Sequence, residues 1–164
     1  MSHLRGNPSG HVILEYGDYE CPYSRRAYRS IQRVEASLEG QVAFEFRHFP
    51  LTEIHPNALA AACAAEAAAL QDRFWEMHDL LFHRQKALED ADLRAYAAEL
   101  ALDAGRFDVD RAGDAVRSSI ATDVDDGITT GEVLGTPTIF LNGNRPSRLV
   151  RLRRADRSPE LTRN

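Results

Sequence analysis

The sequence predicts an α/β fold in which a sheet is flanked by helices and also carries a helical block inserted between its strands. Two short stretches with strand character, 11–16 and 41–49, flank a helical segment. A helical pattern then extends from about 56 to 128, and strand character returns at 135–143. Because the helices lie between two strand regions, we expect them to form an insertion within one domain.

The first strand is predicted at 11–16, where turn residues bound three β-forming side chains: Val12, Ile13 and Leu14. Apolar residues at helical spacing predict a helix from Pro22 to Leu38, and Gly40 is the expected stop. The stretch 41–49 alternates, with one face formed by Val42, Phe44, Phe46 and His48. A strand, a crossover helix and a second strand form a βαβ unit whose strands are parallel.

Four helices are predicted in the inserted block. Asn57 is expected to cap the first helix, which runs to about Leu70, and the second covers 74–82. Asp90 or Asp92 is expected to cap the third. The fourth carries apolar side chains four residues apart: Val116, Ile120, Val124 and Ile128.

Cys21 lies at the turn between the first strand and the first helix, and Pro22 is just inside the helix start, where a missing N–H costs nothing. The first-turn N–H groups and the positive helix end favour a thiolate at this position, and a thiolate is the nucleophilic form of cysteine. The other interpretation is a buried, inert cysteine followed by a proline that only starts a helix.

Four dispersed motifs favour the reactive cysteine. They are Cys21-Pro22-Tyr23, the stretch from Phe46 to Leu51 with His55-Pro56, the stretch from Phe74 to Asp79, and Thr136-Pro137. In this order they resemble the DsbA-like thioredoxin-fold module, including the kind appended to some bacterial antiporters, over about residues 8–143. The resemblance implies a thioredoxin-like fold with a central mixed sheet. It also implies a cis Thr136–Pro137 bond whose loop faces Cys21 and docks an extended substrate segment.

Ser24 is a departure from this family, which has a second cysteine at that position. Cys21 can still attack a disulfide, but it cannot close an intramolecular disulfide within this motif. We therefore predict a thiol–disulfide oxidoreductase that works by monothiol exchange at Cys21 with protein disulfides or glutathione, in which Ser24 donates a hydrogen bond to the thiolate. Ser24 is alternatively a passive helix residue, or an engineered replacement in a dithiol enzyme.

The resemblance assigns supporting roles to Pro22, Tyr23 and Thr136, and Pro137 belongs with the catalytic group. Relatives place a buried acid at the position of Glu15, where it relays protons; a solvent-facing strand carboxylate is an equal alternative. Glu20 flanks the thiol, and its charge is expected to oppose the thiolate.

Cys63 lies among alanines and is expected to be a small hydrophobe. No metal is predicted, because no Cys-x-x-Cys half-site is present and the histidines of the middle of the chain form no tight ligand pattern. These histidines are His48, His55, His78 and His83. No cofactor is expected beyond glutathione or another thiol as co-substrate.

Composition is ordinary for a globular chain, and 164 residues suit one domain. A net charge of −5 gives no general case for nucleic acid, and no stretch approaches a membrane span. Two cysteines and the lack of an apolar leader predict a cytoplasmic protein. Residues 1–10 are expected to be a polar lead-in.

The segment 144–164 departs from the family, which supplies a further strand and a closing helix there. Seven basic residues follow Asn144. A basic arm for nucleic acid or anionic lipid is one interpretation, and a disordered or atypical tail is the one we favour. Without the closing elements the neighbourhood of Leu141 is expected to be adhesive, which leads to homodimerisation or poor stability.

Two rival functions remain open. A kappa-type glutathione transferase or isomerase shares this fold, but it has a serine where this chain has Cys21. A redox-inactive module that binds clients through the proline loop is the second.

Overall fold

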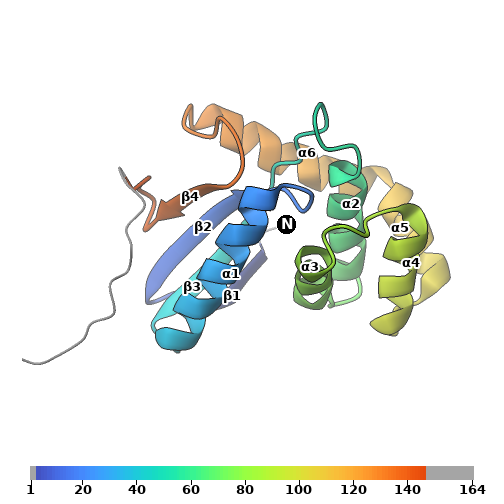
Figure 1. Ribbon diagram of the computed structural model, residues 1–164, viewed down its shortest axis with the longest axis horizontal. Helices are drawn as coiled ribbons and strands as arrows, with labels where there is room; N and C mark the ends of the chain where they lie inside the picture. Colours follow the sequence, from blue (N-terminus) through green and yellow to red (C-terminus); the bar gives the residue numbers. More distant parts are fainter. Residues whose placement is uncertain (1–2, 147–164) are drawn as a thin grey trace, which may run out of the picture.

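The computed structural model describes residues 3–146 and contains one four-stranded sheet with six helices in this range (Figure 1). The strands are β1 (His3–Gly6), β2 (His11–Gly17), β3 (Val42–His48) and β4 (Thr138–Leu141). Their order in the sheet is β1-β3-β2-β4. β2 and β3 are parallel, whereas β1 and β4 pair antiparallel with their neighbours, so the sheet is mixed, as predicted.

The predicted βαβ unit is confirmed. Helix α1 (Pro22–Ser37) connects β2 to β3. The register of this strand pair runs from His11 opposite Val42 to Gly17 opposite His48. The four side chains of the predicted apolar face of β3 are all buried: Val42, Phe44, Phe46 and His48. Gly40 has φ +74°, a conformation that favours glycine and ends the helical path.

The polar lead-in predicted for residues 1–10 is wrong in part, because His3–Gly6 form the edge strand β1. The sequence of this segment has no apolar alternation, and the segment becomes a strand by pairing with β3, where His3 lies opposite Phe46. Arg5 fixes the strand further: its Nε and Nη2 donate to the two carboxylate oxygens of Glu35 on α1, at 2.9 and 2.8 Å. Such partners are remote in sequence, so no local pattern predicts them.

The insertion contains five helices: α2 (Ala58–Ala69), α3 (Phe74–His83), α4 (Asp90–Glu99), α5 (Ala104–Ala112) and α6 (Asp114–Thr129). The helix α5 was not predicted, because only one of its side chains, Phe107, is fully buried. The side chain of Asp103 caps α5 by accepting the Arg106 N–H at 2.8 Å. In Figure 1 the helices α2 to α5 stand beside the sheet, and α6 runs back from them toward β4.

Three details of the predicted helices are wrong. Asn57 does not cap α2 with its side chain, which instead donates to Glu20. Glu89, rather than Asp90 or Asp92, is the N-cap of α4, and Asp92 completes the capping box. On α6 the buried face turns away from Ile128, which is 60% exposed.

The reason for that rotation is the close approach of α6 to the sheet at Gly127. A Cβ on this glycine would lie 3.0 Å from the Tyr16 ring and 3.1 Å from the Phe49 ring. The buried positions of α6 are therefore Val116, Ile120, Asp123 and Gly127.

After β4 the chain turns at Asn142 and Gly143, both with positive φ, as the Asn-Gly pair predicts. Leu141 and Asn144 exchange backbone hydrogen bonds of 2.8 and 3.0 Å across this turn. Leu141 is 40% exposed. The predictions for the tail beyond residue 146 lie outside the described residues. Within residues 3–146 no helix is long and apolar enough to cross a bilayer.

Candidate active site

Cys21 is the N-cap of α1, and Pro22 occupies the first turn, as predicted. Cys21 is buried, with 3% of its surface exposed. Its backbone is fixed on both sides, because the Cys21 N–H donates to the Asp18 carbonyl at 3.1 Å and the Cys21 carbonyl accepts the Arg25 N–H at 3.1 Å. Cys21 therefore lies at the N-terminus of a sixteen-residue helix, the end that carries the positive pole of the helix dipole.

The loop before β4 meets this cysteine from the other end of the sequence. Cys21 Sγ lies 3.4 Å from the carbonyl oxygen of Thr136, to which the thiol donates. The Thr136–Pro137 bond is cis, as the resemblance implies. Thr136 Oγ1 is buried and has no hydrogen-bond partner within residues 3–146. Tyr23, by contrast, is 63% exposed, with the Arg26 guanidinium over its ring.

Ser24 is fully buried one turn into α1. Its Oγ accepts the backbone N–H of Asp18 at 3.2 Å. That contact ties the helix to the loop before the cysteine, so Ser24 is more than a passive helix residue. Among the hydrogen bonds of the described residues none joins Ser24 to Cys21, and the predicted bond to the thiolate stays a prediction.

Asp18 organises the turn, and the sequence analysis did not single it out. Its buried carboxylate accepts three hydrogen bonds, from the Glu20 N–H at 2.8 Å, the Leu51 N–H at 2.9 Å and His55 Nδ1 at 2.7 Å. The loop after β3 is thereby fixed to the cysteine loop. The sequence signal for this role of Asp18 is a short polar side chain followed by a turn, a pattern that is common in loops.

Two more side chains connect the cysteine loop to the insertion. Glu20 accepts both the Asn57 N–H, at 2.7 Å, and the Asn57 side-chain amide, at 3.2 Å. Its carboxylate is thus engaged at the start of α2. Gln85 Nε2 donates to the carbonyls of Tyr19, at 2.7 Å, and Cys21, at 2.9 Å. No local pattern marks Gln85, because its partners are more than sixty residues away.

Glu15 is fully buried on the central strand β2, so the solvent-facing alternative is wrong. Its strand neighbours are Phe46 on β3 and Ile139 on β4. Both carboxylate oxygens lack a hydrogen-bond partner in the described part of the chain. Burial without compensation raises the pKa of Glu15 to about 8, so the group is a neutral acid at pH 7.

A second buried polar pair lies behind the loop. The Tyr19 hydroxyl donates to His78 Nδ1 at 3.0 Å, and both side chains are buried among aromatic rings. Burial raises the pKa of Tyr19 well above its ordinary value, and nearby carboxylates act in the same direction. Burial also lowers the pKa of His78, so His78 is neutral and accepts this bond.

Cys63 is placed as predicted, in a small apolar cluster with Val116 and Ile120 of α6. Burial, the larger cause, raises the pKa of its thiol. Cys21 and Cys63 are both free thiols. The geometry therefore gives Cys63 the environment of a structural residue rather than of a resolving thiol.

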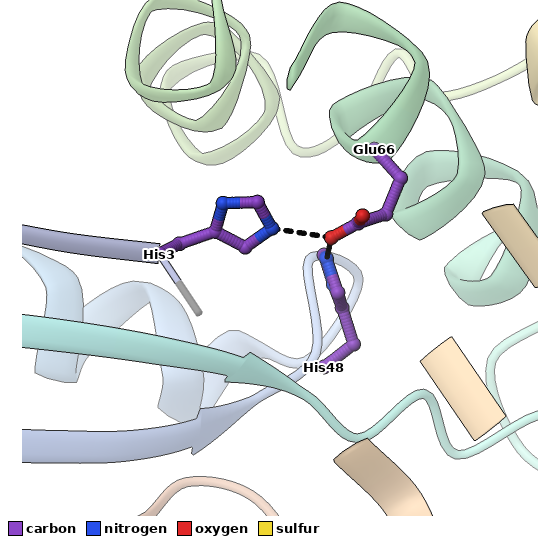
Figure 2. Close-up of side chains that lie close together, drawn as sticks. All are labelled: His3, His48 and Glu66. Atoms are coloured by element: carbon purple, nitrogen blue, oxygen red, sulfur yellow. Dashed lines mark hydrogen bonds and ion pairs between the residues drawn. The ribbon is translucent and has the colours of Figure 1, made fainter. Parts of the chain in front are cut away.

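The structure also brings together three side chains that the metal prediction did not consider as a group. His3 Nε2 and His48 Nε2 both point at Glu66 Oε1, and the His48 contact is 2.9 Å (Figure 2). All three residues are buried. Burial alone would raise the pKa of Glu66, but the two histidines hold it well below its usual range. The sequence holds no local signal for this cluster, because its members come from β1, β3 and α2 and His3 lies in the segment expected to be a polar lead-in.

Comparison with known proteins agrees with this geometry. A thioredoxin family model matches residues 1–155. A thioredoxin-like oxidoreductase from Silicibacter pomeroyi superposes with a TM-score of 0.78 at 26% identity, covering 88% of this chain and 82% of that one. BdbD from Bacillus subtilis gives 0.76 at 21%, over 88% and 83%, and Pseudomonas aeruginosa DsbA2 gives 0.68 at 23%, over 89% and 84%.

Curated relatives include Na(+)/H(+) antiporter NhaA 1 of Salinispora arenicola, 48% identical over 147 residues, and NhaA 3 of Salinispora tropica, 45% identical over 144. The match covers 87% of this chain and 22% of each relative, so the chain spans about a fifth of their length. The likeness concerns one segment of those proteins. The family model matches residues 1–155, so the chain belongs to the thioredoxin family, and its fold, with Cys21 against the Thr136–Pro137 loop, is like that of the DsbA-type structures.

Proposed function

We propose that this chain is a thiol–disulfide oxidoreductase that works by monothiol exchange at Cys21. The observation that carries the proposal is the contact of Cys21 Sγ with the Thr136 carbonyl, at the N-terminus of α1. It supports a reactive sulfur held against a backbone segment that can pair with a client. Cys63, buried against α6, offers no comparable setting.

The exchange has two balanced steps. The Cys21 thiolate attacks one sulfur of a disulfide, forms a mixed disulfide, and releases the other half as a thiolate. An external thiolate then attacks the partner's sulfur in the mixed disulfide and releases Cys21, so a new disulfide leaves the protein. Glu15, which is neutral at pH 7, can supply a proton to a departing thiolate.

Ser24 makes the external thiol necessary. It is fully buried where the family has its second cysteine, and a hydroxyl cannot attack the mixed disulfide as a thiolate does. We infer that Ser24 positions the cysteine loop through its contact with the Asp18 N–H. In the reducing compartment that we propose, such a protein exchanges or reduces disulfides rather than introducing them.

An anionic thiol such as glutathione suits a cavity beside the cysteine loop. This cavity of about 320 Å³ is lined by Arg25, His83, Arg84, Gln85, Lys86 and Ala87. Gln85 connects it to the Cys21 carbonyl, and Arg25 lies one helical turn after Cys21. Arg25 Nη2 donates to the His83 carbonyl at 3.3 Å and Arg25 Nε has no partner in residues 3–146, whereas Arg84 is already in an ion pair with Glu99. Arg25 and Lys86 are therefore the cations placed to meet a carboxylate.

A polypeptide client is supported by the apolar side chains in the two segments that meet at Cys21. Tyr23 is 63% exposed on α1, and Leu134, two residues before Thr136, is 86% exposed. Exposed large side chains next to a reactive group are typical of a contact surface.

The test is incubation with oxidised glutathione followed by mass spectrometry of the intact protein and its peptides. We expect one glutathione on Cys21, released by fresh thiol. Cys21→Ser should abolish the adduct and Cys63→Ser should leave it. The exchange would be refuted if no adduct formed and Cys21 were alkylated no faster than a thiol in an unfolded chain. The redox-inactive client-binding module would then be the remaining function. Conjugation of glutathione to an electrophile without an adduct would favour the transferase.

A further inference from the structure

We infer that His3, His48 and Glu66 form a binding site for a zinc-type divalent cation. The three residues come from three elements that are far apart in the sequence, β1, β3 and α2. One ligand atom from each lies within 4.8 Å of the others. Figure 2 shows both imidazole Nε2 atoms directed at the same carboxylate oxygen, with the two histidines approaching from the sheet side and Glu66 from its helix.

The donor set fits this class of metal. Two imidazole nitrogens and one carboxylate oxygen are a known zinc set in proteins, in which a water or substrate occupies the fourth position. Nε2 of a neutral histidine binds zinc at about 2.0–2.1 Å, so ligand atoms around one ion lie slightly more than 3 Å apart in tetrahedral geometry, about 3.3 Å. The His48–Glu66 separation of 2.9 Å lies below that value and the His3–Glu66 contact is shorter still, so an ion would enter as the three side chains move apart.

The burial and charge of the cluster favour a cation there. Glu66 is 2% exposed, and an ionised carboxylate that is buried to this extent needs a positive partner. His3 and His48 each share a proton with this carboxylate through Nε2. A divalent ion in the place of the shared protons would supply positive charge, and the low polarity of the walls would strengthen its attraction to Glu66.

The rings are already oriented for this role. The His3 ring is stacked on Phe74 with centroids 3.4 Å apart and an interplanar angle of 4°. The His48 ring packs edge to face against Phe46 at 5.5 Å, and the His48 backbone N–H donates to the Asp123 carboxylate at 2.9 Å, which fixes the backbone of this residue. Ligands fixed by their surroundings lose little entropy when they bind an ion.

One feature bears on the affinity. Metal at Nε2 moves the ring proton to Nδ1, and His48 Nδ1 is buried with no hydrogen-bond partner among residues 3–146. Metal-bound histidines usually donate this proton to a second group, and loss of such a partner lowers affinity by about tenfold to a hundredfold. We therefore expect a site weaker than structural zinc sites with complete outer hydrogen bonds.

The experiment is titration of the chelator-treated full chain with Zn²⁺ by calorimetry and with Co²⁺ by visible absorption. We expect one ion per chain, a rise in Tm at saturating Zn²⁺, and a Co²⁺ spectrum without a thiolate charge-transfer band. His48→Gln and Glu66→Gln should each weaken binding by at least about tenfold. His55→Gln is the matched control, because it removes a different histidine–carboxylate pair.

His3→Gln keeps the measurement informative if the His48 and Glu66 variants fail to fold, because β1 is an edge strand and the His48–Glu66 bond remains. This variant should bind at least about tenfold more weakly while its circular dichroism is unchanged. Binding of no ion by the wild-type chain, a thiolate band in the Co²⁺ spectrum, or equal losses in the His55→Gln control would each overturn the site. The first result would leave a hydrogen-bonded cluster.

Discussion

The burial of Glu15 gives the fold a specific dependence on pH. This carboxylate is fully buried on β2 and has no hydrogen-bond partner in the described chain, which raises its pKa to about 8. In the unfolded chain its pKa is near 4.5. Between these values the unfolded state has lost the proton and the folded state keeps it. The folded state is therefore stabilised below pH 4.5, and the free energy of unfolding falls as pH rises toward 8.

The magnitude follows from the same shift. Each pH unit within this window costs about 1.4 kcal/mol, so the linkage removes roughly 2 to 3 kcal/mol between pH 5 and 7. Glu15→Gln should abolish this slope, because the amide does not titrate. The constant cost of burying the amide leaves the slope unaffected. The free energy of unfolding of the variant minus that of the wild type should therefore increase by roughly 2 to 3 kcal/mol between pH 5 and pH 7.

The assay is urea unfolding at several pH values from 5 to 9, followed by the fluorescence of Trp75, the single tryptophan. Trp75 packs against Phe44, so its emission reports the loss of the core. Glu39→Gln, which changes an exposed carboxylate in the turn after α1, is the control and should keep the wild-type slope. Parallel stability curves for the wild type and Glu15→Gln would refute a neutral buried Glu15.

Three further changes test the site. Ser24→Cys should allow an intramolecular disulfide with Cys21, seen as the loss of two of the variant's three thiols on mild oxidation, whereas three persisting thiols would show that the two positions cannot pair. Thr136→Val should raise the free energy of unfolding by about 1 kcal/mol in urea, because its buried hydroxyl lacks a partner among the described residues; a loss of stability would show that the hydroxyl is paired. Asp18→Asn should destabilise by about 2 kcal/mol, since an amide cannot accept all three hydrogen bonds, and an unchanged midpoint would remove Asp18 from its organising role.

The predictable part of the fold is the part determined by short-range patterns. Alternation in β3 and the apolar spacing of α1 lie within single windows of sequence, so the βαβ unit could be predicted. Cys21 and Thr136 were found through motifs that the family shares, and the structure brings them within 3.4 Å. The rotation of α6 was beyond this method, because it depends on the fit of Gly127 against rings of the sheet.

The polar groups around the site could not be predicted for a related reason. Asp18, Gln85 and Glu66 each act through at least one partner that is 18 to 66 residues away, and each has an ordinary local setting. A hydrophobic pattern indicates which side of an element is buried. It does not indicate which buried polar atoms meet, since that depends on the final registry of separate elements.

These long-range bonds assign a role to the insertion. Apolar contact alone is not directional, so helices packed on a sheet only through apolar side chains can shift with little cost. Here the insertion and the loop before it are also fixed at separate polar points: Glu20 to Asn57, Gln85 to the Tyr19 and Cys21 carbonyls, and Glu66 to His48. A shift of the helices by one residue would break these bonds, and each fully buried group left unpaired would cost about 1–3 kcal/mol. The insertion therefore holds the Cys21 loop in one geometry opposite Thr136, and substitutions in it should alter cysteine reactivity without touching the sulfur.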